Sequence, residues 1–122
     1  MDSRLREGII LFNDRRFFEC HEVLEALYQE IAPADKPFVE GLIQLAAAFR
    51  IFSEFGEVKG PVRMIYQALV RFENYQPDFL QVRVQEMSAA LERWAKQAEK
   101  AASPPAVASV PKIPLQRSWF FS

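Results

Sequence analysis

The single histidine of the chain, His21, lies four residues before Glu25 in the stretch FFECHEVLEALY, residues 17–28. Residues four apart on a helix have Cβ atoms roughly 5 to 6 Å apart, so these side chains can hydrogen-bond each other or chelate one ion. Glu40 and Gln44 repeat the spacing in the stretch EGLIQLAAAF. Burying such groups without partners costs roughly 1 to 3 kcal/mol each. We therefore expect both polar pairs to be buried and to contact each other between two helices.

Two interpretations fit these residues. In the first, the pairs form a structural hydrogen-bond cluster that fixes one helix on the other. In the second, a divalent metal ion or a small ligand binds at one site. His21 and Glu25 are its metal ligands, and Glu40 or Gln44 and the Tyr28 hydroxyl at its edge complete it. One imidazole among several oxygens suits manganese, iron or magnesium better than zinc, which prefers nitrogen and sulfur ligands.

Motifs for catalysis are few in this chain. A ferritin-like di-iron centre requires a Glu-x-x-His motif on each of two helices, and the sequence contains none. Glu25 stands where a zinc protease of the His-Glu-x-x-His class would have its second histidine. General acid–base chemistry by His21 would need a cleft, which a sequence does not reveal. Whether the protein is an enzyme is left open.

Apolar residues recur mainly at helical spacing, and strand-like alternation is almost absent. Breaker residues divide the chain into five expected helices, at about 3–13, 15–31, 37–56, 60–73 and 78–102. Asp14 and Asp78 are expected to cap the second and the last of these helices. The third helix is apolar nearly all round and should be central, with Gly41 allowing close approach. The fold class is therefore all-α, a single-domain bundle of about five helices.

The last part of the chain, residues 103–122, holds half of the eight prolines and ends in QRSWFFS. Because proline prevents the helix from continuing, we expect a bundle domain over residues 1–102 followed by an extended C-terminal arm. Trp119, Phe120 and Phe121 would forgo burial if they stayed in water. We expect them to be anchored near the fourth and fifth helices of the same chain or of a second copy in a homodimer, with a different protein partner as the alternative.

Composition limits the classes of function. The 15 lysines and arginines are scattered among 16 acidic residues, so the basic stripe typical of nucleic-acid binding is missing. Neither a signal peptide nor an apolar run near the roughly 18 residues of a membrane span is present. Cys20 is the single cysteine and is expected to be a small buried hydrophobe in a reducing compartment. We expect a cytoplasmic protein that binds neither nucleic acid nor membrane.

The run FNDRRFFECHEVLEALY followed by EGLIQLAAAF resembles the domain of unknown function 309 family of bacteria and archaea. The signature of that family is a histidine, three residues, a glutamate, two residues and then tryptophan or tyrosine, which here are His21, Glu25 and Tyr28. The resemblance covers residues from about 5 to 60 clearly and the fourth helix more weakly, and the proline-rich tail lies outside it. It implies a small helical fold of unassigned activity, with metal binding as a hypothesis for the family. Glu40 departs from the pattern, since a glutamine is expected there.

Two hypotheses about function follow. The protein is either a small domain that binds a metal ion or small ligand at the His/Glu cluster, or an interaction protein. In the second case the cluster is structural, and the bundle surface or the aromatic arm binds another chain.

Overall fold

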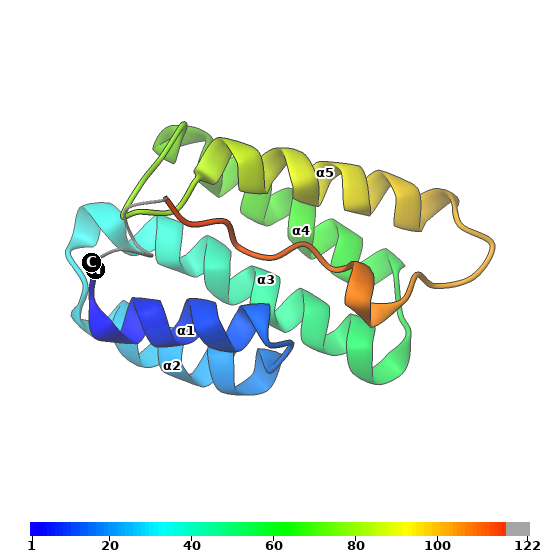
Figure 1. Ribbon diagram of the computed structural model, residues 1–122, viewed down its shortest axis with the longest axis horizontal. Helices are drawn as coiled ribbons and strands as arrows, with labels where there is room; N and C mark the ends of the chain where they lie inside the picture. Colours follow the sequence, from blue (N-terminus) through cyan, green and yellow to red (C-terminus); the bar gives the residue numbers. More distant parts are fainter. Residues whose placement is uncertain (117–122) are drawn as a thin grey trace.

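Five α-helices form most of the part of the chain that the computed structural model describes, residues 1–116 (Figure 1). They are α1 (Ser3–Asn13), α2 (Phe17–Glu30), α3 (Lys36–Phe55), α4 (Lys59–Phe72) and α5 (Val84–Lys100). Short 3-10 turns lie at Pro33–Asp35, Glu73–Tyr75 and Val107–Ser109. The described residues contain two isolated β-bridges and no strand. The all-α fold class and the number of helices are confirmed, and no helix in this part of the chain is long and apolar enough to cross a membrane.

The central position predicted for the third helix is also confirmed. α3 packs against α2 on one side and α4 on the other (Figure 1). The missing side chain of Gly41 allows α4 to approach closely, because a Cβ there would lie 2.6 Å from Cε1 of Phe72. Gly56 ends the helix in the left-handed conformation, with φ of 67°, which a glycine adopts at little cost.

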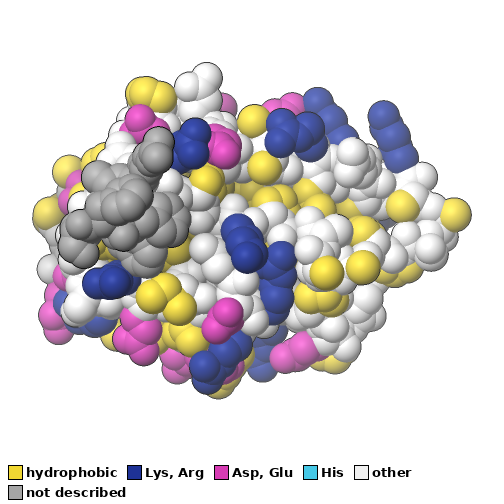
Figure 2. Space-filling model, in the orientation of Figure 1, with side chains coloured by type: hydrophobic (Ala, Val, Ile, Leu, Met, Phe, Trp, Pro, Cys, Tyr) yellow, Lys and Arg dark blue, Asp and Glu magenta, His cyan; other side chains and the backbone are white. Residues whose placement is uncertain are grey.

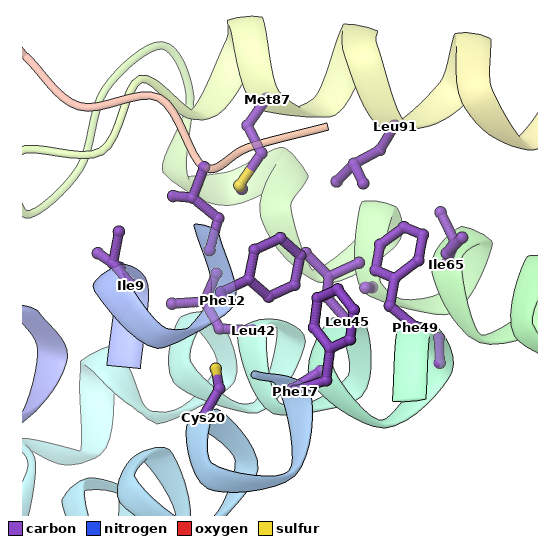
Figure 3. Close-up of a cluster of buried hydrophobic side chains, with 14 of the residues drawn as sticks. Ile9, Phe12, Phe17, Cys20, Leu42, Leu45, Phe49, Ile65, Met87 and Leu91 are labelled. Atoms are coloured by element: carbon purple, nitrogen blue, oxygen red, sulfur yellow. The ribbon is translucent and has the colours of Figure 1, made fainter. Parts of the chain in front are cut away.

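Aromatic rings join the helices into one hydrophobic core (Figure 3). The rings of Phe12, Phe17 and Phe49, from three helices, have centroids 5.2 to 5.8 Å apart. Trp94 of α5 packs edge-on against Phe49 and Phe52, at 5.1 and 5.0 Å. Offset and edge-to-face contacts of this kind stabilise a core beyond the area they bury. The apolar helix faces that the sequence spacing predicted therefore pack against one another in the core.

The last helix begins later than predicted. The sequence placed its start after Asp78, but Val84 is its first residue. The intervening turn, Phe79–Val82, closes on itself in a β-bridge, and Leu80 and Gln81 have φ of 48° and 67°. A left-handed backbone cannot continue a right-handed helix. The prediction was wrong because the apolar spacing of the helix happens to extend back through the turn.

The turn between α1 and α2 differs from the prediction as well. Asp14 follows α1 as its C-cap residue, and Arg16 holds the N-cap position of α2 without a side-chain cap bond. Arg15, between them, has φ of 66°. Its guanidinium donates a hydrogen bond to the carbonyl oxygen of Val110, near the end of the chain. The residues of this turn thus hold a distant segment instead of capping α2.

That segment, residues 101–116, is here called the C-terminal segment. It runs from the end of α5 back along the bundle, past the end of α1, to the turn that precedes α5 (Figure 1, orange to red). Its buried side chains are Val110, Ile113 and Leu115. The indole N–H of Trp94 donates to Oγ of Ser109 at 2.9 Å, and the N–H of Gln116 donates to the carbonyl oxygen of Gln81 at 2.8 Å. The segment therefore contributes to the same core as the helices.

Two further expectations concern the end of the chain. Trp119, Phe120 and Phe121 lie outside the described residues. That residues 1–102 form a domain of their own stays a prediction.

On the face that carries the C-terminal segment, basic and acidic side chains are interspersed (Figure 2).

Candidate functional site

The first predicted pair lies on the edge of α2 that borders α3. Nε2 of His21 is 3.6 Å from Oε1 of Glu25, and its Nδ1 is 3.8 Å from Oε1 of Glu22. The side chain of His21 is 28% exposed and that of Glu25 is 56% exposed. The spacing prediction for the pair is confirmed, but the prediction that it is buried was wrong. Leu24 and Leu27 fill the core-facing side of α2, and the pair is turned away from them to the rim.

The second pair has a partner that the sequence did not predict. Arg71 of α4 donates one hydrogen bond to Oε1 of Glu40 at 3.1 Å and another to Oε1 of Gln44 at 3.2 Å. The amide of Gln44 in turn donates to Oε1 of Gln67 at 3.4 Å. These hydrogen bonds of Glu40 and Gln44 therefore run to α4, whereas α2 was expected. The sequence contained a signal for this partner, because Gln67 and Arg71 are four residues apart and so lie on one face of their helix.

A shallow pocket of about 280 Å³ lies between α2 and α3. Its lining residues are Glu25, Tyr28, Gln29, Glu40 and Ile43. The ammonium group of Lys36 sits 4.6 Å from the centroid of the Tyr28 ring. The structure thus brings together three of the five predicted site residues, while His21 and Gln44 are not among the lining residues.

Metal ligands are sparse in this region. Residues 1–116 contain no group of three or more histidine, cysteine, aspartate or glutamate side chains placed to hold one metal ion. Catalytic zinc usually has three protein ligands, and oxygen-binding metals take six or more ligands in all. An ion at His21 and Glu25 would have to complete its coordination with water or with groups from another molecule.

An apolar row continues the site along α3. Ala47 and Ile51 are half-buried and precede Phe55 at spacings of four, so the three side chains lie on one face. Phe55 is 70% exposed, and Phe18 of α2 is 47% exposed. The sequence predicted a third helix that is covered almost all round. The structure instead leaves one side of α3 open between α2 and α4.

Cys20 precedes His21 directly in the sequence, but its side chain lies in the core. Its side chain is fully buried, and this burial raises the pKa of the thiol to about 12. A thiol with that pKa is protonated at neutral pH and is a poor nucleophile. The expectation of a small buried hydrophobe is confirmed.

Comparison with known families decides the relationship that the sequence indicated. Residues 5–64 match the model of the family described as Domain of unknown function (DUF309). The chain belongs to the DUF309 family through this region. The DUF309 region spans α1 to α3 and the start of α4, so it includes both polar pairs, whereas Arg71, α5 and the C-terminal segment lie beyond it. No curated protein and no solved structure matches the chain. The protein is thus a helical DUF309 protein of uncharacterised function.

Proposed function

We propose that this DUF309 protein is an interaction protein that binds another protein chain. Its binding surface is the side of α2, α3 and α4 that carries the apolar row and the polar pairs, here called the outer face. The observation that supports this is the row formed by Ala47, Ile51 and Phe55, together with the exposed Phe18 of α2, which lies over the guanidinium of Arg50 on the same helix as the row. Exposed apolar side chains that gather in one place, rimmed by polar ones, are typical of interaction surfaces.

The polar residues fit the same proposal as structural and rim groups. Arg71 ties α4 to α3 through Glu40 and Gln44, which holds the outer face in one shape. The guanidinium of Arg50 lies 4.5 Å from the centroid of the Phe18 ring and pairs with Glu54 at 3.1 Å. An arginine stacked on an aromatic ring is a common contact at interfaces, because it offers both apolar area and charge.

Site-specific photocross-linking tests the proposal. A photoreactive phenylalanine analogue at position 55 of the full-length protein, expressed in its native host, should give a discrete cross-linked band. The same analogue at Gln85, an exposed position of α5, is the matched control and should give no such band. Equal cross-linking at both positions, or none at position 55, would contradict an interaction through the outer face.

A second candidate function is binding of a small organic cation in the pocket beside Tyr28. The Lys36 ammonium over the Tyr28 ring favours it, because it shows that the ring accepts a cation. Glu25 and Glu40 would supply carboxylates to the same ligand. Titration with 1,4-diaminobutane should then shift the NMR signals of the Ile43 methyl groups, and the shift should vanish in Tyr28→Leu. Unchanged Ile43 signals in the wild-type protein at millimolar diamine would rule this candidate out.

A further inference from the structure

This inference rests on the proposed function and names the partner. We propose that the outer face binds a second copy of this chain, in a dimer whose two-fold axis runs roughly parallel to α3. Three features of the outer face support this arrangement. Apolar and polar side chains separate along α3, opposite charges lie on the two helices beside it, and the area of the face suits a dimer.

Along α3 the outer face has an apolar half and a polar half. The mainly apolar half, near the end of α3, contains Phe18, Ala47, Ile51 and Phe55, with the Arg50–Glu54 ion pair at its edge. The polar half, near the start of α3, contains Glu25, Tyr28, Glu40, Gln44 and Arg71. Two contacts fix this order, because Phe18 lies at the level of Arg50 whereas Arg71 bonds Glu40. A partner that matches this face must present an apolar half and a polar half in the same order.

The two helices that flank α3 present opposite charges to the outer face. α2 contains four glutamates and no lysine or arginine, and it borders the outer face with Glu22 and Glu25. α4 contains no acidic residue and borders the outer face with Arg63 and Arg71, whereas its third basic residue, Lys59, lines a pocket with α5. The α2 edge of the outer face is therefore acidic and the α4 edge basic. α3 between them carries Lys36, Glu40, Arg50 and Glu54, two charges of each sign that sum to zero.

A two-fold axis parallel to α3 satisfies both divisions at once. Such an axis places the α3 helices of the two copies against each other, pointing the same way, with each residue at the same height along the axis in both copies. The apolar halves therefore meet. It also lays the acidic α2 of each copy on the basic α4 of the other. A two-fold axis in the same plane but perpendicular to α3 would set α2 on α2 and α4 on α4, with like charges opposed. Electrostatic complementarity of this kind selects one orientation of two copies over another.

The size of the outer face suits a dimer. α3 has 20 residues and is about 30 Å long at roughly 1.5 Å per residue. With neighbouring helices about 8–10 Å apart, the three helices present a surface on the order of 600 Å² on each copy. Side-chain relief adds to this flat area, which brings it near the roughly 800 Å² per partner of a standard interface.

The charges identify which residues face each other. Gln67 bonds Gln44, and Arg63 lies one turn earlier on α4, at the level of Ala48. Glu22 lies one turn after Phe18, near the level of Ala46 or Ala47. The proposed axis therefore sets Glu22 against Arg63 of the second copy. Both side chains are exposed in the single chain, so they can be changed without disturbing the core.

Sedimentation of the purified full-length protein tests the dimer. We expect a species of twice the 14.1 kDa chain mass at micromolar concentration. Phe55→Ser and Phe18→Ser should each weaken dimerisation at least about tenfold. Ile10→Ser is the matched control and should leave it unchanged, because Ile10 is 45% exposed and lies on α1 beside the C-terminal segment. A dimer that both phenylalanine variants leave intact would overturn the inference.

Charge reversal tests the orientation. Glu22→Arg and Arg63→Glu should each weaken the dimer several-fold, because each sets like charges against each other. The double variant should restore the dimer, because it exchanges the two charges and so brings opposite signs together again. Failure of the double variant to restore the dimer would exclude the proposed axis.

The oligomeric state also separates this inference from the proposed function. If the wild-type chain is monomeric at all concentrations tested, the second copy is excluded as the partner. A cross-link from position 55 to a different protein would then leave the proposed function standing, and its absence would remove both.

Discussion

The side-chain amide of Asn13 makes two hydrogen bonds with the backbone of Ile113, a residue one hundred positions later in the chain. Its Oδ1 accepts the N–H of Ile113 at 2.7 Å, and its Nδ2 donates to the carbonyl oxygen of Ile113 at 3.2 Å. Ile113 is only 3% exposed, so water has little access to those backbone groups. Asn13 therefore satisfies the backbone N–H and C=O groups of Ile113, as the backbone of a neighbouring strand would in a sheet.

We expect Asn13→Ala to lower the free energy of unfolding by about 1 to 3 kcal/mol, because it leaves buried backbone groups of Ile113 without partners. Urea unfolding followed by circular dichroism measures this loss. Asp14→Ala is the matched control, since Asp14 is exposed and adjacent, and it should change stability by less than about 0.5 kcal/mol. Equal effects of the two variants would show that the Asn13 bonds do not stabilise the fold.

Removing residues 103–122 should unfold much of the bundle. The truncation takes away three buried side chains, Val110, Ile113 and Leu115. At about 1.5 to 3 kcal/mol each their burial sums to roughly 5 to 9 kcal/mol, similar to the whole stability of a small domain. NMR signal dispersion of the 1–102 fragment measures the outcome. A well-dispersed spectrum would instead support the sequence-based boundary at residue 102.

The sequence predicted the helices well because their signal is local. Apolar residues at helical spacing identify the buried side of each helix, whatever that side packs against. The burial of Leu42 and Leu45 in α3, and of Leu91 in α5, follows from this spacing alone. The start of α5 was missed because two left-handed residues interrupt the helix without interrupting the apolar pattern.

The site was predicted less well because it depends on how helices pair. Spacing placed His21 beside Glu25 and Glu40 beside Gln44, and both placements are correct. Which pair meets which helix depends on side chains far away in the sequence, and Arg71 on α4 takes the second pair. A helical wheel shows on which side of its own helix a side chain lies, but it does not show which other helix packs against that side.

Gly41→Ala should destabilise the protein by about 1 to 3 kcal/mol, the usual cost of overpacking a core. The added Cβ would lie 2.6 Å from the ring of Phe72 and push α4 away from α3. Gly60→Ala is the control, because a Cβ at that position of α4 meets nothing within 4 Å. The control should be neutral or slightly stabilising, since alanine is the better helix former. Thermal unfolding of both variants gives the comparison.

The thiol of Cys20 should resist labelling in the folded protein. Burial raises its pKa to about 12, so at pH 8 the reactive thiolate is roughly a thousand-fold rarer than in an unfolded chain with a pKa near 8.5. Reaction with Ellman's reagent should be slow in buffer and fast in urea. Because the folded pKa is the higher one, the stability from burying this thiol is present at neutral pH and declines as the pH rises from about 8.5 towards 12. Fast labelling of the native protein would show that Cys20 is accessible.

The last prediction concerns metal at His21 and Glu25. Two partly exposed ligands bind a divalent ion weakly, so protein purified without an affinity tag should carry less than about a tenth of an equivalent of metal. Elemental analysis after growth with manganese, iron and zinc provides the measurement. If instead a stoichiometric metal is found, and both His21→Ala and Glu25→Ala lose it while keeping their helical content, the metal hypothesis holds. The remaining ligands must then come from water or from the second copy. If the second copy supplies them, the metal content should also fall in Phe55→Ser, which touches neither ligand, whereas with water as the remaining ligand Phe55→Ser should keep its metal.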